Sequence, residues 1–269
     1  MPSPQHSLPF PDPAEPAVVP VPAKPPALPR APRTWYFIGT TLFGVGAFAI
    51  ETIAQLVMYA VLIFGFGVTQ VETDAELKTV MMNGAWLSLA VIAGCPALLG
   101  ALWIPVRIAR QSYSDYLGLR WPSRSEVATG FAMLAAFQLA WFLLRLAFGQ
   151  PIPDFMIDTY KTAKASGALD VYVIGFCVAA PVAEEFLFRG FILRGWSQSF
   201  LRPAGAVVLS SLVWAYLHSQ YNLFYMAAIF SLGILLGTLR LRSGSTWLTV
   251  TLHAVHNLLA VAQVAWLIG

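Results

Sequence analysis

The sequence is poor in charged residues and in cysteine. Only 11% of its 269 residues are charged and 58% are hydrophobic, whereas about a quarter of an average soluble domain is charged. The net charge is +3, and no basic stripe supports a nucleic-acid partner. The two cysteines, Cys95 and Cys177, lie in apolar runs without metal-binding or redox spacing. We therefore expect both cysteines to act as small core residues.

Long apolar runs are abundant, and a run of about 20 apolar residues is typical of a helix that crosses a bilayer. The pattern predicts an all-α, multi-pass transmembrane helical bundle with about seven spans, the fifth of them short. The predicted spans lie near residues 35–66, 80–104, 126–148, 169–196, 204–219, 222–239 and 245–268.

The first 33 residues have a different composition from the rest of the chain. They hold twelve of the nineteen prolines, and proline disrupts helices and favours the extended, solvated polyproline II conformation. We predict a disordered, proline-rich cytoplasmic tail over residues 1–33. An N-terminal transmembrane region of three spans follows over 34–164, and a core of four spans over 165–269.

Arginine residues are concentrated in alternate loops. By the positive-inside rule, this alternation predicts a cytoplasmic N-terminus and a C-terminus on the opposite side. We expect a multi-pass integral protein of the plasma (inner) membrane, surrounded by membrane lipid. The arginines in question are Arg30, Arg33, Arg107, Arg110, Arg120, Arg124, Arg194, Arg202, Arg240 and Arg242.

The stretch AEEFLFRGF, residues 183–191, places three charges inside an apolar run. Each charge near the centre of a membrane helix costs about 2.5–3.5 kcal/mol, so these side chains must face the protein interior or a wet cavity. Glu185 and Arg189 are four residues apart, in the favourable order for an ion pair. Glu184 points about 100° away around the helix and lacks that partner. The residues suit a general base at Glu184, or an ion pair that only locks helix packing.

Two further polar groups stand in apolar surroundings. His218 lies near the end of the fifth predicted span, one turn after Trp214. His253 and Asn257 lie four residues apart on one face of the last span. Because these groups come from different helices, they predict a polar cavity shared with Glu184.

Together these side chains are suited to amide hydrolysis without a covalent intermediate. Glu184 can take a proton from water, and His218 can hold that water. His253 and Asn257 can donate hydrogen bonds to the oxyanion that forms on the carbonyl. A zinc site with Glu184, His218 and His253 as ligands remains an alternative, although the sequence contains no HExxH motif.

Three short motifs occur in order over residues 165–269. EEFLFR matches EExxxR, WAYLH resembles FxxxH with Trp214 in place of Phe, and HAVHN matches HxxxN. In this order the motifs resemble the CPBP family of intramembrane proteases, also called the CAAX amino-terminal protease or Abi family. The tryptophan keeps an aromatic wall at the position of the phenylalanine.

The resemblance implies a helical membrane core that opens to the cytoplasmic side. It implies water activation by Glu184 and His218, and oxyanion binding by His253 and Asn257. Both a metal-dependent and a metal-free glutamate mechanism are compatible with it. The residues to which it gives supporting roles are Glu185, Arg189 and Trp214.

The sequence thus predicts an intramembrane endopeptidase acting on a membrane-associated peptide or protein, for which a prenylated CAAX-type C-terminus is one candidate. A non-catalytic membrane scaffold or bacteriocin-immunity protein is an alternative, and so is a transporter that uses the same polar cavity. The residues do not identify the substrate, the oligomeric state, the need for a metal or the role of the tail. They also leave open the roles of Glu51 and His256.

Overall fold

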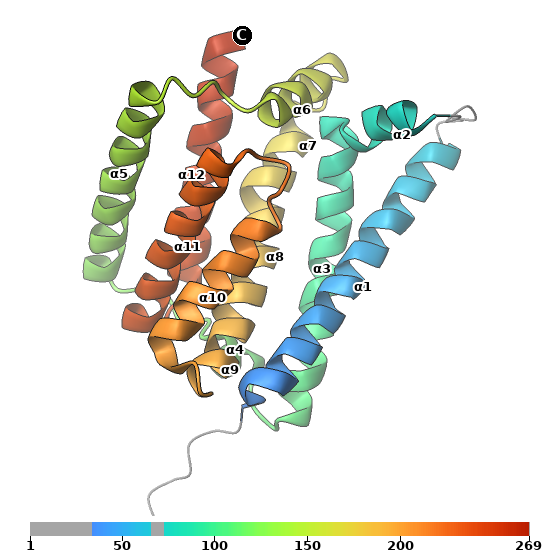
Figure 1. The fold of residues 1–269 in the computed structure, drawn as a ribbon. Helices are drawn as coiled ribbons and strands as arrows, with labels where there is room; N and C mark the ends of the chain where they lie inside the picture. The colour runs from blue at the N-terminus through green and yellow to red at the C-terminus, as the bar shows by residue number, and fades with distance from the viewer. Residues whose placement is uncertain (1–33, 66–72, 269) are drawn as a thin grey trace, which may run out of the picture. The chain divides into compact units, whose positions relative to one another are not determined.

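The computed structural model describes residues 34–65 and 73–268. Over these ranges the regular structure is helical, as Figure 1 shows, which confirms the all-α prediction. The proline-rich tail at residues 1–33 lies outside the described residues.

Within residues 34–65 and 73–268, six helical stretches are long and apolar enough to cross a membrane. Five are single helices: α1 (Tyr36–Gly65), α3 (Gly84–Ile108), α5 (Arg124–Ala147), α11 (Leu223–Ser243) and α12 (Thr246–Ile268). The sixth runs over Leu169–Ser197 and alternates α-helix with π-helix. Its parts are α7 (Leu169–Ile174), η1 (Gly175–Ala179), α8 (Ala180–Glu185), η2 (Phe186–Ile192) and α9 (Leu193–Ser197).

The short fifth span of the prediction corresponds to α10 (Arg202–Tyr216). Its 15 residues rise only about 22 Å, whereas the hydrocarbon core of a bilayer is about 30 Å thick. Six of the predicted spans therefore have helices of membrane-spanning length, and α10 ends inside that thickness.

Three short helices lie mainly in segments between the predicted spans. They are α2 (Asp74–Met81), α4 (Tyr113–Leu117) and α6 (Asp154–Ala165). α6 buries Thr159, Tyr160 and Ala163 on one face and packs against α3, α7 and α12. Because the other face is polar, the average hydropathy of the segment is low and does not reveal the buried face.

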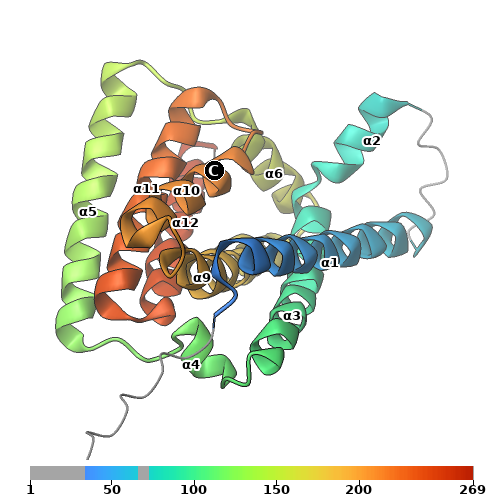
Figure 2. The same cartoon turned by 60° about the horizontal axis from the view of Figure 1, so that its bottom comes forward.

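The arginine-bearing loops among the described residues lie at one end of the bundle (Figure 1), as their alternation predicts. Figure 2 turns this end toward the viewer and shows α4 and α9 near the start of α1. Arg194 donates to the backbone oxygen of Tyr116 and to Gln111 Oε1, both at 3.0 Å. Arg240 donates to the Leu117 oxygen at 3.2 Å. These bonds hold α4 against the ends of α9 and α11.

α10 and α11 pack closely through small residues. A Cβ added at Gly233 would lie 2.7 Å from Ser211 Cβ, and one added at Gly237 would lie 3.0 Å from Val207 Cγ1. The close approach also leaves the Gly233 carbonyl within reach of Arg189, whose Nη2 lies 3.5 Å from it. This contact connects the helix pair to the charged segment of η2.

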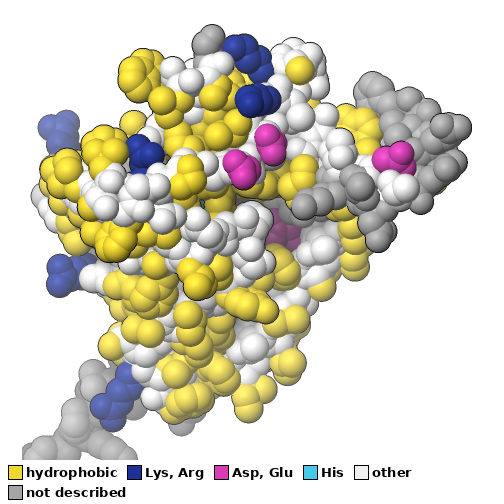
Figure 3. All heavy atoms as spheres, turned by 45° about the horizontal axis from the view of Figure 1, so that its top comes forward, with side chains coloured by type: hydrophobic (Ala, Val, Ile, Leu, Met, Phe, Trp, Pro, Cys, Tyr) yellow, Lys and Arg dark blue, Asp and Glu magenta, His cyan; other side chains and the backbone are white. Residues whose placement is uncertain are grey.

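Many large apolar side chains are exposed, and the yellow areas in Figure 3 show them on one face of the molecule. Soluble monomers seldom expose such extended apolar faces, so the described helices belong to an integral membrane protein. Cys95 and Cys177 are both buried and free, as expected for small core residues. Examples of the exposed side chains are Ile38, Leu42, Phe64, Trp103, Leu223 and Trp266.

Candidate active site

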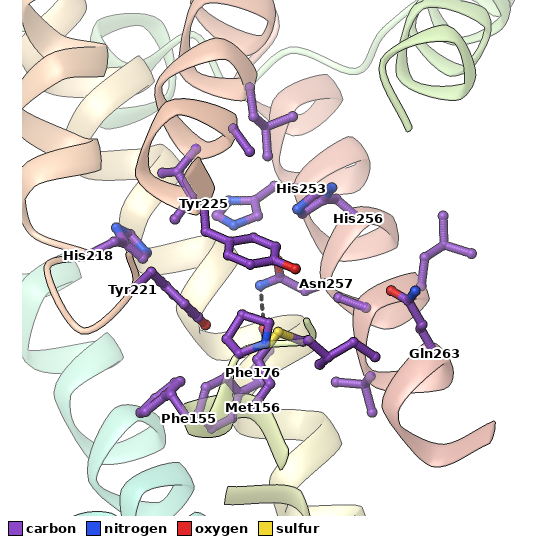
Figure 4. A pocket seen from close by; sticks show the side chains of 18 of the residues that line it. Phe155, Met156, Phe176, His218, Tyr221, Tyr225, His253, His256, Asn257 and Gln263 are labelled. Atoms are coloured by element: carbon purple, nitrogen blue, oxygen red, sulfur yellow. Dashed lines mark hydrogen bonds between the residues drawn. The ribbon is translucent and has the colours of Figure 1, made fainter. Parts of the chain in front are cut away.

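A cavity of about 560 Å³ is lined by residues of α3, α5, α6, α7, η1, α8, α10, α11 and α12. Its walls include the later halves of α5 and α12 and the first half of α11. These are the halves farthest from the arginine-bearing loops, so the cavity occupies the opposite half of the bundle. Figure 4 shows part of its lining, with histidines, tyrosines and Asn257 pointing into it.

The four residues predicted to be catalytic all line this cavity. Glu184 comes from α8, His218 from the turn after α10, and His253 and Asn257 from α12. Although the structure brings these side chains to one place, their catalytic roles remain predictions.

Glu184 is held by a partner that the sequence did not reveal. The indole nitrogen Nε1 of Trp214 donates a hydrogen bond to Glu184 Oε2 at 2.5 Å. A phenylalanine, as in the FxxxH motif, has no group to donate there. Trp214 is therefore more than an aromatic wall, because it fixes one carboxylate oxygen and leaves the other for a second partner.

Trp214 also contacts Arg189, His218 and His253. The guanidinium carbon of Arg189 lies 4.3 Å from the indole centroid, a cation–π contact. The rings of His218 and His253 each lie 5.3 Å from the same indole in edge-to-face geometry. One buried side chain thus orients groups from three parts of the chain.

Glu185 forms the predicted ion pair and has a third member. Arg189 Nη1 donates to Glu185 Oε1 at 2.8 Å, and both side chains are almost fully buried. His253 Nδ1 lies 3.0 Å from the same oxygen. Because a carboxylate oxygen can only accept, Nδ1 of His253 carries a proton, and Nε2 points away from Glu185. The Glu185–Arg189 pair therefore supports His253 directly.

Asn257 is positioned by the break in the long helix. Its Nδ2 donates to the backbone oxygen of Phe176 at 2.8 Å, the dashed line in Figure 4. Phe176 lies in η1, where a π-helix pairs each oxygen with the N–H five residues later. That residue is Pro181, which has no N–H. Asn257 supplies the missing donor, and its second amide hydrogen is left for the cavity.

His218 has a defined tautomer if it is neutral. Its Nδ1 lies 2.8 Å from the backbone oxygen of Trp214, and since a carbonyl can only accept, Nδ1 must carry the proton. Nε2 is then the acceptor nitrogen. A neutral His218 is thus suited to accept a hydrogen bond from water in the cavity.

Several lining residues were not predicted. Tyr225 donates from its hydroxyl to the Pro151 oxygen at 2.6 Å, which connects α11 to the loop before α6. Tyr221 stacks near His218, with ring centroids 6.4 Å apart. Burial raises the pKa of Tyr221 above its usual range, so its hydroxyl remains a neutral donor at physiological pH. Residues 219–222, which include Tyr221, carry no charge and gave no signal for this role.

His256 and Glu51, whose roles the sequence left open, have different surroundings. His256 lines the cavity, and its Nδ1 lies 2.9 Å from Gln138 Oε1, which connects α12 to α5. Glu51 is buried in α1 and packs beside Gly94 of α3. It is not part of the cavity wall.

The zinc alternative does not fit the side-chain arrangement. Within the ranges 34–65 and 73–268, no three His, Cys, Asp or Glu side chains converge as metal ligands. One oxygen of Glu184 instead accepts a hydrogen bond from Trp214 Nε1. We therefore derive no step through a metal.

Comparison with known proteins supports the resemblance found in the motifs. A family model described as type II CAAX prenyl endopeptidase, Rce1-like, matches residues 167–259. An uncharacterized 24.3 kDa protein of Escherichia coli is 31% identical over 123 residues, which cover 45% of this chain and 56% of that protein. The match thus spans about half the length of that relative. No solved structure matches the chain.

Proposed function

We propose that this chain, whose residues 167–259 match the Rce1-like CAAX protease family, is an intramembrane endopeptidase that uses activated water. The observation that carries the proposal is the meeting of Glu184, His218, His253 and Asn257 at one cavity. All four lie within the matched residues. Hydrolysis requires a base, a group that holds the water, and donors to the oxyanion. Glu184, His218 and the pair of His253 and Asn257 can fill these roles.

The proposed reaction needs no covalent intermediate. The free oxygen of Glu184 takes a proton from water, while Nε2 of His218 accepts the water's other hydrogen bond. The resulting hydroxide attacks the scissile carbonyl carbon, and His253 and Asn257 donate to the oxyanion. When the tetrahedral intermediate collapses, the C–N bond breaks and protonated Glu184 returns the proton to the leaving amine.

The cavity walls favour an apolar substrate. Phe137, Trp141, Phe155 and Phe176 line the cavity around the polar groups, and such walls bind apolar side chains or lipid groups. A membrane-associated peptide or protein is the proposed substrate class, with a prenylated C-terminus as one candidate.

A transporter would need a path to both faces of the membrane. Below the cavity, toward the arginine-bearing end, the bundle is filled by buried side chains such as Leu117, Phe191 and Leu193. A cavity confined to one half of the bundle favours hydrolysis over transport.

Chelation is expected to leave peptide cleavage unchanged, because the described residues do not form a metal ligand set. The measurement is the rate of cleavage of an apolar fluorogenic peptide by the protein in liposomes, before and after treatment with a zinc chelator. Loss of activity on chelation, with recovery on adding zinc, would show that the metal-free mechanism is wrong. A lack of cleavage in every condition would count against the endopeptidase itself.

The position of the cavity bears on the orientation of the site. We propose a cytoplasmic N-terminus, because the arginine-rich end carries the start of α1 and the positive-inside rule places such ends in the cytoplasm. The cavity lies in the opposite half and thus faces the other side of the membrane. The resemblance instead implied a cytoplasmic opening, and these two expectations cannot both hold.

Cysteine labelling distinguishes the two orientations. With Cys95 and Cys177 replaced by alanine, single cysteines are introduced at exposed positions by Ser166→Cys, near the cavity end, and Ser125→Cys, at the arginine-bearing end. In right-side-out vesicles, a membrane-impermeant maleimide is expected to label the first variant and spare the second. Both should react after detergent is added. The reverse pattern would place the cavity on the cytoplasmic side.

A further inference from the structure

Arg145 is a charged residue of the cavity wall to which the proposed reaction gives no role. It lies in the last turn of α5 and is half-buried. Among the described residues that line the cavity, Arg145 is the one Lys or Arg, and Glu184 is the one Asp or Glu. Trp214 already engages Glu184, so Arg145 supplies a positive charge within mostly apolar surroundings.

The charge of Arg145 is not neutralised by the described part of the chain. No described Asp or Glu oxygen lies within ion-pair distance of it. Arg145 Nη1 makes a weak hydrogen bond to the backbone oxygen of Gln150 at 3.3 Å, and the guanidinium carbon lies 5.7 Å from the centroid of the Phe142 ring. By contrast, Arg189 is paired with Glu185 inside the bundle. A guanidinium beside apolar walls favours an anionic partner.

We propose that Arg145 binds a carboxylate of the substrate and thereby selects peptides that carry one near the cleaved bond. The inference rests on the proposed function and names a specificity residue within the same cavity. A guanidinium binds a carboxylate through two parallel hydrogen bonds, which fixes orientation as well as adding affinity. The carboxylate can come from the peptide C-terminus or from an Asp or Glu side chain.

The helix register sets the distance between the carboxylate and the cleaved bond. Gln138 of α5 is bonded to His256, one turn beyond His253 on α12. Arg145 follows Gln138 by seven residues, which is about 10 Å along the same helix face. An extended peptide rises about 3.3 Å per residue. The carboxylate is therefore expected about three to four residues beyond the cleaved bond.

The test uses an N-acylated apolar octapeptide in two forms, one with a free C-terminal carboxylate and one with a C-terminal amide. We expect the wild type to cleave the acid with a kcat/KM about 10- to 100-fold above that of the amide. Arg145→Gln is expected to bring this ratio close to one, mainly by raising KM for the acid. Arg242→Gln is the matched control, because Arg242 lies in the last turn of α11 at the arginine-bearing end. An unchanged ratio in Arg145→Gln would overturn the proposal.

Two further experiments test which carboxylate Arg145 binds and whether it binds one when no peptide is cleaved. Amide peptides with an Asp at successive positions reveal whether a side-chain carboxylate replaces the terminal one. Binding of both octapeptides to Glu184→Gln is measured by fluorescence anisotropy, with and without Arg145→Gln, which tests Arg145 even if no peptide is cleaved. Preferential binding of the acid that requires Arg145 supports the subsite, and equal binding of acid and amide contradicts it. An absence of cleavage by the wild type would count against the proposed function alone.

Discussion

Glu184→Gln is expected to lower kcat for peptide cleavage by about 10²- to 10⁴-fold, the usual contribution of a general base. The amide has nearly the same shape, and its oxygen can still accept the hydrogen bond from Trp214 Nε1. It cannot take a proton from water. The measurement is single-turnover cleavage in liposomes, combined with thermal unfolding of the purified variant to show that the fold is kept.

Asp158→Asn serves as the control for this experiment. Asp158 is an exposed carboxylate of α6, so its loss changes the net charge equally without touching the cavity. Its rate should match that of the wild type. If Glu184→Gln cleaves at the wild-type rate, Glu184 is not the base and the proposed mechanism fails.

Glu185→Ala is expected to destabilise the protein by about 3–5 kcal/mol, because removing one partner leaves the buried Arg189 charge uncompensated. The loss should appear as a lower unfolding temperature in detergent. His253 would also lose the acceptor at its Nδ1, so the fraction that remains folded should cleave slowly.

A double variant separates stability from activity. Replacing both charges, as Glu185→Leu with Arg189→Met, removes the ion pair without leaving a buried charge, and such exchanges are often neutral. We expect near wild-type stability with low activity, since His253 still lacks its carboxylate. Full activity in the double variant would show that Glu185 does not support His253. Stability as low as that of Glu185→Ala would show that the unpaired charge is not the cause.

The membrane helices could be predicted from sequence because hydropathy alone decides whether a long helix is stable in lipid. Hydropathy does not reveal the residue at which a helix ends. α10 is apolar enough for a span, yet it ends at Tyr216 after 15 residues. The segment of α6 falls between two predicted spans because its polar face lowers the average hydropathy, although its other face is buried.

Within the site, only contacts that follow helix spacing were predictable. Glu185 and Arg189 are four residues apart, so the pair follows from the geometry of one helix. The bond between Trp214 and Glu184 joins residues 30 positions apart, and that between His253 and Glu185 joins residues 68 positions apart. Such contacts depend on how the helices pack, and that packing could not be derived from the spacing of residues along the chain.

Because α10 is short, the polar segment that follows it lies within the thickness of the hydrocarbon layer. After Tyr216 the chain turns through exposed Ser219, Gln220 and Asn222, about 8 Å short of a 30 Å hydrocarbon layer. Non-helical backbone is not tolerated in contact with hydrocarbon, so we expect headgroups and water to sink toward this turn. The surrounding bilayer would be thinned on one flank only, and membranes with longer acyl chains would accommodate the protein less readily.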